Sequence, residues 1–336
     1  MTILLTGAAG FIGMHTALRL LERGDVVVGI DNLNPYYDVN LKRARLANLT
    51  AHHHFSFYPQ DIAESEAMAA LFAQIKPQRV IHLAAQAGVR YAVTHPHAYI
   101  RANIQGFMAI LEGCRQQRVE HLVYASSSSV YGANACLPFD EQQTTNHPLS
   151  LYAATKKSNE LMAHTYSHLY QIPTTGLRFF TVYGPWGRPD MALFQFTRAM
   201  LRGEPIEIFN HGQMVRDFTY IDDVVESIIR IHDNVATVDT HFDAKHPNPA
   251  SSHAPYRVFN IGNSQAVLLL DYIRVLEQVL GVNADKRYLT LQPGDVLATA
   301  ANSDALAAWI NFSPNTPVQQ GVAAFVDWYR SYYGYC

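Results

Sequence analysis

The stretch Gly7-Ala8-Ala9-Gly10-Phe11-Ile12-Gly13 decides the fold, because it joins the strand-like run Ile3–Thr6 to the helix-like run Met14–Arg23. Glycines at this spacing allow a tight turn, a close approach of the backbone to a pyrophosphate, and close packing of helix on strand. The N-terminus of the helix then faces the phosphates. The stretch therefore predicts a dinucleotide site, to which it contributes Gly7, Gly10, Phe11, Ile12 and Gly13.

Strand and helix patterns alternate on the C-terminal side of this stretch. Short runs rich in β-branched residues are separated by longer runs with apolar residues every three or four positions, which is typical of βαβ units. The strand runs are Val26–Ile30, His54–Tyr58, Arg79–Ala84, His121–Ser126 and Thr174–Phe179, and the helix runs are Glu64–Ile75, Ile104–Gln116 and Leu151–Tyr170. The order predicts an α/β fold with a Rossmann-type doubly wound parallel sheet over residues 1–182.

The pattern changes after Tyr183, where the turn-forming sequence Gly184–Pro189 begins. A helix pattern at Leu193–Leu201 precedes two strand patterns, Ile206–Phe209 and Val215–Thr219, on either side of an Asn-His-Gly turn. We expect a smaller C-terminal α/β substrate domain over residues 183–336, with some later segments returning to the first domain. Residues 240–255 contain three prolines and no apolar period, so we expect a surface loop.

The composition excludes several classes of function. Hydrophobic residues make up 49% of the 336 residues and the net charge is -3, so no basic excess favours nucleic acid. No apolar run approaches the roughly 18 residues of a membrane span. The three cysteines form no CxxC pair, and His52–His54 have no carboxylate or cysteine nearby to complete a metal site. We expect a cytoplasmic protein without a metal.

Asp31 ends the second predicted strand, 18 residues after Gly13. A carboxylate at this point accepts hydrogen bonds from the ribose hydroxyls of NAD and repels the 2′-phosphate of NADP. No arginine follows at once in Asp31-Asn32-Leu33, although Lys42 and Arg43 come later. The pattern favours NAD.

Two further motifs carry acid–base chemistry. Tyr152 and Lys156 lie four residues apart in a predicted helix, so they share a face, and a nearby ammonium favours the phenolate. The serine run Ser126–Ser129 follows a predicted strand at the edge of the sheet where ligands of such folds bind. A tyrosine base, a lysine and a serine are therefore expected around one cavity.

With these motifs in this order, the chain resembles the extended short-chain dehydrogenase/reductase family, the NAD-dependent epimerases and dehydratases, over nearly its whole length. The resemblance implies a triad of Ser127, Tyr152 and Lys156 and a homodimer packed through the helices at Ile104–Gln116 and Leu151–Tyr170. It also implies that cofactor-binding residues include Asn32, Asp61, Ile62, Ala84, Ala85 and Asn103, in addition to the tyrosine and lysine.

The residues before Val130-Tyr131-Gly132 distinguish members of the family. Dehydratases typically carry TDEVYG and glucuronate decarboxylases TSEVYG, whereas Ser128 and Ser129 stand here. A hydroxyl cannot easily replace a carboxylate as proton acceptor at neutral pH. The serines therefore argue against both reactions and fit an epimerase.

The segments Arg178–Met191, Gln86–Arg90 and Pro293–Leu297 are similar to those of UDP-glucuronate 4-epimerases. Glucose-type epimerases usually have asparagine in place of Thr181 and an arginine near Gln292. The resemblance implies that Thr181, Ser128 and Ser129 lie near the sugar carboxylate and that the diphosphate is held by an arginine. The substrate-binding residues it implies are Arg90, Ser128, Ser129, Thr181, Arg188, Arg216, Gln292 and Asp295, with Arg216 on the diphosphate and Arg90 and Arg188 available to either anion.

The resulting hypothesis is a 4-epimerase in which Tyr152, its pKa lowered by Lys156, removes the proton of the sugar 4-OH, alongside Ser127. A transient 4-keto sugar then turns in the pocket and is reduced on its other face. Other interpretations stay open: a UDP-glucose/galactose-type 4-epimerase is the nearest, followed by a UDP-glucuronate decarboxylase and a non-catalytic dinucleotide-binding protein.

Overall fold

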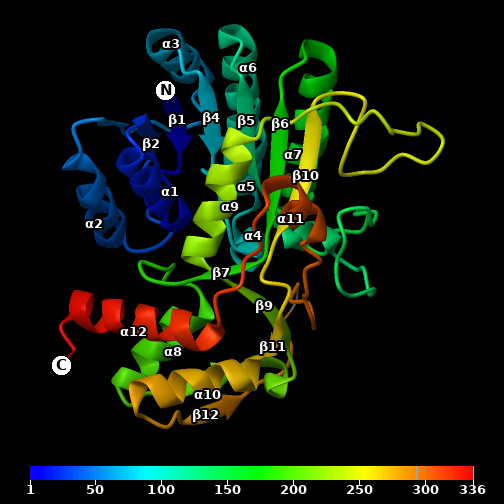
Figure 1. Cartoon of the computed structure of the whole chain (residues 1–336). Helices are drawn as coiled ribbons and strands as arrows, with labels where there is room; N and C mark the ends of the chain where they lie inside the picture. The colour runs from blue at the N-terminus through cyan, green and yellow to red at the C-terminus, as the bar shows by residue number, and fades with distance from the viewer. Residues whose placement is uncertain (293, 336) are drawn as a thin grey trace.

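A seven-stranded parallel sheet forms the centre of the molecule in the computed structural model, which describes residues 1–292 and 294–335 (Figure 1). The strand order is β10-β6-β5-β4-β1-β2-β3, and every neighbouring pair is parallel. The strands are β1 (Thr2–Thr6), β2 (Val26–Ile30), β3 (Phe55–Tyr58), β4 (Arg79–His82), β5 (His121–Ser127), β6 (Thr174–Phe179) and β10 (Tyr256–Ile261). The predicted Rossmann-type sheet is confirmed, with β10 as a seventh strand from late in the chain.

Both faces of this sheet are covered by helices because successive strand residues point to opposite sides. In β1, Ile3 and Leu5 pack into one apolar cluster and Leu4 into another. The first cluster includes α1 (Phe11–Glu22), α2 (Val39–Thr50) and α9 (Ile221–Asp233), and the second α3 (Ser65–Ile75), α6 (Gly106–Gln117) and α7 (Leu151–Tyr170). The result is three layers.

A smaller part lies below the carboxyl ends of the large sheet (Figure 1). It has a three-stranded sheet, β11-β9-β7, and a two-stranded parallel sheet, β12-β8. Its elements are β7 (Thr181–Tyr183), α8 (Ala192–Leu201), β8 (Ile206–Ile208), β9 (Val215–Tyr220), β11 (Ala266–Leu268), α10 (Leu269–Leu280), β12 (Lys286–Tyr288) and α12 (Val318–Tyr333). The strands predicted around the Asn-His-Gly turn exist, but β8 and β9 lie in different sheets.

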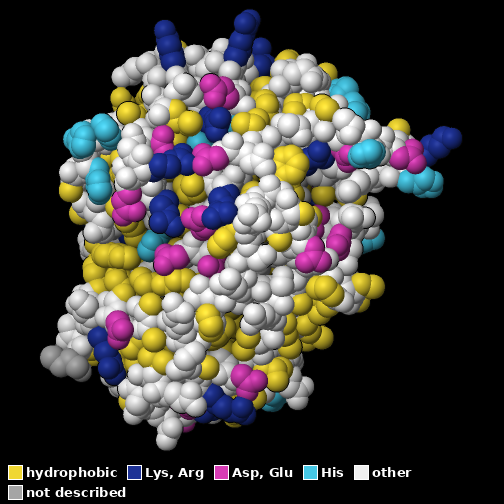
Figure 2. Space-filling view, in the orientation of Figure 1, with side chains coloured by type: hydrophobic (Ala, Val, Ile, Leu, Met, Phe, Trp, Pro, Cys, Tyr) yellow, Lys and Arg dark blue, Asp and Glu magenta, His cyan; other side chains and the backbone are white. Residues whose placement is uncertain are grey.

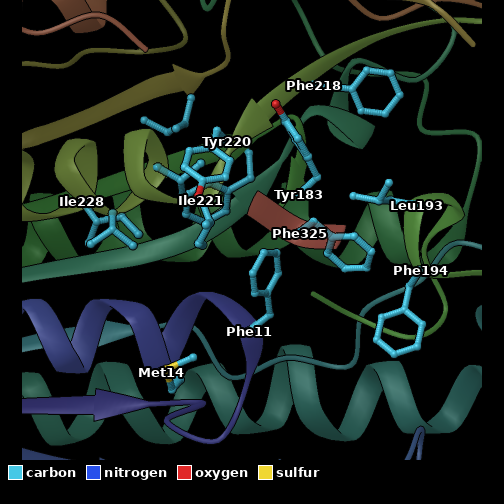
Figure 3. Close-up of a cluster of buried hydrophobic side chains, with 14 of the residues drawn as sticks. Phe11, Met14, Tyr183, Leu193, Phe194, Phe218, Tyr220, Ile221, Ile228 and Phe325 are labelled. Atoms are coloured by element: carbon cyan, nitrogen blue, oxygen red, sulfur yellow. The ribbon is translucent and has the colours of Figure 1, made fainter. Parts of the chain in front are cut away.

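The apolar core is continuous between the two parts (Figure 3). Phe11 and Met14 of α1 belong to the same cluster as Ile221 of α9 and Phe325 of α12. Phe194 of α8 contacts Phe325 edge to face, with 6.0 Å between ring centroids. This shared core fixes the two parts relative to each other, and the cavity described below lies between them.

Several boundaries differ from the predicted ones. The helix after the glycine loop begins at Phe11, not Met14, because Gly10 already serves as its extended N-cap. The third predicted helix begins as a π-helix, Ile100–Gln105, before α6. The remaining helical segments are α4 (Tyr91–Thr94), α5 (Pro96–Tyr99), α11 (Asp304–Ile310) and the 3-10 turns Ser128–Tyr131 and Phe209–Gly212.

Residues 240–255 form an irregular loop between α9 and β10, as expected. The loop projects to one side of the molecule in Figure 1, and Figure 2 shows charged and histidine side chains on it. It lies apart from the cavity described next, since no residue of this loop lines that cavity in the described part of the chain.

Candidate active site

A cavity of about 740 Å³ lies where the carboxyl ends of the parallel strands face the smaller part. Its wall on the large sheet includes Gly7 after β1, Asp31 after β2 and Ser128 after β5, while Glu207 and Arg216 come from β8 and β9. A cavity of this size is typical of small-molecule sites. The predicted residues that line it are Gly7, Gly10, Phe11, Ile12, Gly13, Asp31, Asn32, Asp61, Ile62, Ala84, Ala85, Arg90, Ser127, Ser128, Ser129, Tyr152, Lys156, Thr181, Arg188, Arg216 and Asp295.

The glycine loop fits a pyrophosphate. Gly7 has φ +75°, and a Cβ there would lie 2.8 Å from the backbone nitrogen of Ala84. A Cβ on Gly13 would collide with the carbonyl of Gly7. Only glycines allow this backbone, which exposes the first N–H groups of α1 to the cavity. The loop thus has the shape that a dinucleotide requires.

Asp31 lies beside this loop with its side chain in the cavity wall. Its Oδ2 accepts a hydrogen bond from Ala9 N at 3.2 Å, and its Oδ1 one from Leu33 N at 2.8 Å. Burial raises the pKa of Asp31, while Lys42 opposes the rise. The Nζ of Lys42 donates to the carbonyl of Asn34 at 2.8 Å, and Lys42 lines the cavity. Arg43 is exposed and is not among the described residues that line it.

Asn103 is not among the described residues that line the cavity, and its role as a cofactor-binding residue stays a prediction. The side chain is only 2% exposed. Its amide exchanges hydrogen bonds with the backbone of Gln86, at 2.8 and 3.0 Å, and donates to Thr155 Oγ1 at 3.0 Å. Asn103 therefore ties the segment after β4 to α7.

Tyr152 and Lys156 lie on one face of α7 and both line the cavity, as predicted. The Nζ of Lys156 donates to the carbonyl of Ala125 at 2.8 Å, and burial lowers the pKa of Lys156 to about 8. Burial raises the pKa of Tyr152, opposed by a hydrogen bond with Ser127 and by the charge of Arg188. The expected lowering by Lys156 is wrong for this structure, because desolvation of the phenol dominates.

An ion pair behind these residues was missed in the sequence. Arg178 on β6 donates from Nε and Nη2 to the two carboxylate oxygens of Glu160, at 2.8 and 3.0 Å, and both residues are fully buried. Glu160 Oε1 also accepts a hydrogen bond from Ser126 at 2.7 Å. Since Glu160 stands one turn after Lys156, this pair fixes α7 against β5 and β6. The sequence offered one signal for Glu160, which lies four residues after Lys156 and therefore on the same face of the helix.

The wall of the cavity near Tyr152 contains hydroxyls and one arginine. Ser128 and Ser129 begin the 3-10 turn after β5, and Thr181 begins β7 beside it. Arg188 binds Asp190 through two hydrogen bonds, at 3.0 and 2.5 Å, and Tyr36 donates to the same carboxylate at 3.0 Å. The contact between Tyr36 and Asp190 was not foreseen, because these two residues lie 154 positions apart in the chain.

The far end of the cavity contains the other predicted anion-binding residues. Arg90 forms a 2.8 Å ion pair with Asp295, and its guanidinium lies 4.5 Å from the ring centroid of Phe209. Arg216 donates to the carbonyl of Val296 at 2.7 Å. Gln292 is not among the described residues that line the cavity, and its assignment to the substrate site stays a prediction.

Two other features are absent from the described residues. No helix there has the length and apolar character to cross a membrane. No group of three or more histidine, cysteine, aspartate or glutamate residues there is arranged to hold a metal ion.

Comparison with known proteins agrees with the geometry. The family model of the NAD dependent epimerase/dehydratase family matches residues 3–262. The chain belongs to this family. Its sequence is 58% identical to an uncharacterized 37.6 kDa protein of Escherichia coli O111:H-, over 99% of both chains. It is 48% identical to the "Probable UDP-glucuronate 4-epimerase" of Rhizobium meliloti (strain 1021), over 99% of this chain and 98% of that one.

Among solved structures of the family, that of UDP-glucuronic acid 4-epimerase from Bacillus cereus, in complex with UDP-glucuronic acid and NAD, superimposes with a TM-score of 0.87. It is 33% identical and the match covers 99% of this chain and all of the other. The predicted fold and family are confirmed.

Proposed function

We propose that this chain is a UDP-glucuronate 4-epimerase, which interconverts UDP-glucuronate and UDP-galacturonate with tightly bound NAD. The observation that carries the proposal is the wall beside Tyr152, where Ser128, Ser129 and Thr181 present hydroxyls. A carboxylate at position 128 or 129 would provide the proton transfer at C5 that a dehydratase needs. The names of the relatives and of the superimposed enzyme support the same reaction.

We assign NAD to the end of the cavity that has the glycine loop. The close backbone packing at Gly7 and Gly13 fits the pyrophosphate, and the Asp31 carboxylate fits the ribose hydroxyls. Asn32, Asp61, Ile62, Ala84 and Ala85 complete this end of the wall. When bound, NAD supplies reversible oxidation at C4 of the sugar and a positive charge beside the phenol.

Tyr152 takes up the proton of the sugar 4-OH, and Ser127 lies between or beside the phenol oxygen and the 4-OH oxygen. The hydrogen bond with Ser127 and the charge of Arg188 favour the phenolate against the desolvation that raises the pKa of Tyr152. Lys156 is fixed on Ala125, where its ammonium helps to balance the phenolate. The same tyrosine returns the proton after the 4-keto sugar has turned.

Oxidation at C4 makes a uronate into a β-keto acid, which can lose CO2. Ser128, Ser129 and Thr181 are placed to hold the carboxylate by neutral hydrogen bonds, out of the orientation that weakens its bond to C5. Arg216 and Arg90 then hold the diphosphate, with Asp295 beside them, and Arg188 is available to either anion. The sugar thus turns while its UDP end stays fixed.

The remaining proposals concern organisation. We assign cofactor binding to residues 1–182 and UDP-sugar binding to residues 183–336, with α9, β10 and α11 returning to the first part. We also propose that the protein is a cytoplasmic homodimer packed through α6 and α7. The dimer is supported by exposed apolar side chains on these helices: Met108, Leu161, Leu169 and Tyr170 are 41%, 59%, 60% and 46% exposed. Such patches commonly mark interfaces.

The test is incubation of the purified protein with UDP-glucuronate and no added NAD, followed by separation of the products. We expect UDP-galacturonate at equilibrium with its epimer and no free keto or pentose product. A decarboxylated product would assign the chain to the decarboxylases, and faster turnover of UDP-glucose would assign it to the glucose-type epimerases. No turnover of any UDP-sugar would favour a non-catalytic role.

A further inference from the structure

Arg45 is a buried cation without an acidic partner. It lies on α2, its side chain is 0% exposed, and no carboxylate of the described residues lies within salt-bridge distance of it. A buried charge is costly unless its polar groups are satisfied. The hydrogen bonds of this guanidinium therefore indicate what it does.

The guanidinium makes five hydrogen bonds, all to neutral oxygens. Nε and Nη2 donate to the carbonyl of Trp186 at 3.0 and 2.6 Å, and Nη2 also donates to the carbonyl of Gly187 at 3.0 Å. Nη1 donates to the carbonyl of Ala9 at 3.3 Å and to the hydroxyl of Tyr37 at 2.7 Å. These oxygens belong to three separate segments of the chain.

The first segment is the glycine loop. The Ala9 N–H donates to Asp31, while the Ala9 carbonyl accepts from Arg45. Ala9 is therefore held by its N–H on one side and by its carbonyl on the other, which fixes the loop that we assign to the pyrophosphate. The charge of Arg45 also opposes the rise in the pKa of Asp31.

The second segment leads to the substrate-facing arginine. Trp186 has φ +62°, a left-handed conformation that is unusual for a residue with a side chain. Its ring lies against Trp328 and Tyr332 of α12, with centroids 5.2 and 5.0 Å away. The carbonyls of Trp186 and Gly187, which directly precede Arg188, accept hydrogen bonds from Arg45.

We infer that Arg45 is a positioning residue that couples the glycine loop to the loop of Arg188, so that cofactor and sugar are held in one relative placement. The inference rests on the proposed function for the identity of the sugar nucleotide. Lysine cannot replace this residue, because a single ammonium cannot span three segments as a planar fork does. Arg45 itself touches neither ligand, since it is not among the described residues that line the cavity.

The experiment compares Arg45→Lys with Arg79→Met. Arg79 is the matched control, because it also donates to a buried carbonyl, that of His232 at 2.7 Å, far from the cavity. NAD content after purification, thermal stability, and KM and kcat per NAD-loaded subunit for UDP-glucuronate are measured for both. We expect Arg45→Lys to lose bound NAD and to raise KM by about tenfold, with kcat within about threefold. Arg79→Met should change only stability.

A double-mutant cycle with Arg188→Met separates positioning from general damage. If Arg45 acts through the Arg188 loop, Arg45→Lys should raise KM little further in the Arg188→Met background. Tyr37→Phe, which removes one of the four acceptor oxygens, should raise KM by about two- to threefold and replaces Arg45→Lys if that variant does not fold.

Wild-type KM and NAD content in Arg45→Lys, or KM effects that multiply fully in the double mutant, would overturn the inference. If the wild type does not turn over UDP-glucuronate, the proposed function fails. The comparison then stands on NAD content alone: loss in Arg45→Lys and retention in Arg79→Met support the coupling, and equal retention overturns it.

Discussion

The two ends of the cavity are built from different material. At the dinucleotide end, the glycine loop presents backbone, and one carboxylate beside it, that of Asp31, is proposed to select the ribose. At the sugar end, the cavity is lined by side chains that come from separate elements: Ser128 from the turn after β5, Tyr152 from α7 and Thr181 from β7. Changes at the first end should therefore affect which cofactor is bound, and changes at the second the chemistry and the choice of sugar.

Replacing Tyr152 should have the largest effect. Tyr152→Phe removes the group that transfers the 4-OH proton, so we expect kcat to fall by about 10²–10⁴-fold with NAD content and UDP-glucuronate binding nearly unchanged. Stopped assays and titration calorimetry measure both. Tyr272→Phe is the control, because the Tyr272 hydroxyl is buried outside the cavity without a hydrogen-bond partner in the described chain. Near-normal turnover of Tyr152→Phe would remove the phenolate from the mechanism.

Breaking the Glu160–Arg178 pair should have the next largest effect, because its hydrogen bonds join α7 to β5 and β6 behind the sugar end. Burial raises the pKa of Glu160, but Arg178 outweighs it and lowers that pKa to about 2. The folded pKa lies below the unfolded value of about 4.3, so the pair stabilises the protein above that pH and less as the pH falls towards 2.

Glu160→Gln should cost about 3–5 kcal/mol of unfolding free energy at neutral pH, because Arg178 stays buried without its partner. Urea unfolding between pH 2 and 7 should show a weaker loss of stability on acidification in the variant. If the unfolding free energies of wild type and variant fall in parallel as the pH is lowered, the ion pair does not stabilise the protein.

A change at Asp31 tests the dinucleotide end. Asp31→Asn keeps an acceptor for Ala9 N–H but removes the charge that repels a 2′-phosphate, and Lys42 nearby would attract it. We expect the preference for NAD over NADP to fall by about tenfold or more. Binding of both cofactors to the cofactor-free protein measures this, with Asp271→Asn as the control, because Asp271 pairs with Arg274 and is not among the described residues that line the cavity. An unchanged ratio would mean that backbone alone selects the cofactor.

The smallest effect is expected for a single hydroxyl of the sugar wall. Ser128→Ala should lower kcat/KM for UDP-glucuronate relative to UDP-glucose by about three- to tenfold, the value of one neutral hydrogen bond. Ser227→Ala is the control, since Ser227 donates to the carbonyl of Asp223 within α9 and is not among the described residues that line the cavity. If both variants change the ratio equally, the hydroxyl of Ser128 does not recognise the carboxylate.

The same contrast explains what could be predicted from the sequence. The residues expected at the dinucleotide end could be predicted because a glycine loop and the residue ending the next strand have fixed spacings. Of these residues, only Asn103 is not among the described residues that line the cavity. At the sugar end, Tyr152, Lys156 and Ser127 were found by local motifs. The contact of Tyr36 with Asp190 and the Glu160–Arg178 pair were missed, because the first joins residues 154 apart and the second joins a helix to the strand that follows it.

Electrostatics was the least predictable quantity. A tyrosine and a lysine on one helix face predict a lowered phenol pKa, but burial raises the pKa of Tyr152 and lowers that of Lys156 to about 8. The extent of desolvation depends on how the smaller part covers the cavity, and no local pattern encodes it. Arg45 was overlooked for a related reason, since its oxygen partners are backbone carbonyls, which every sequence has.

The most direct test of the account is to run the reaction with UDP-glucuronate in heavy water and to analyse both epimers for deuterium at C5. A site whose wall has hydroxyls at positions 128, 129 and 181 inverts C4 without removing the C5 proton, so no deuterium should enter at that carbon. Substantial incorporation at C5 would show that a base acts there, and would contradict the assignment of this wall to an epimerase.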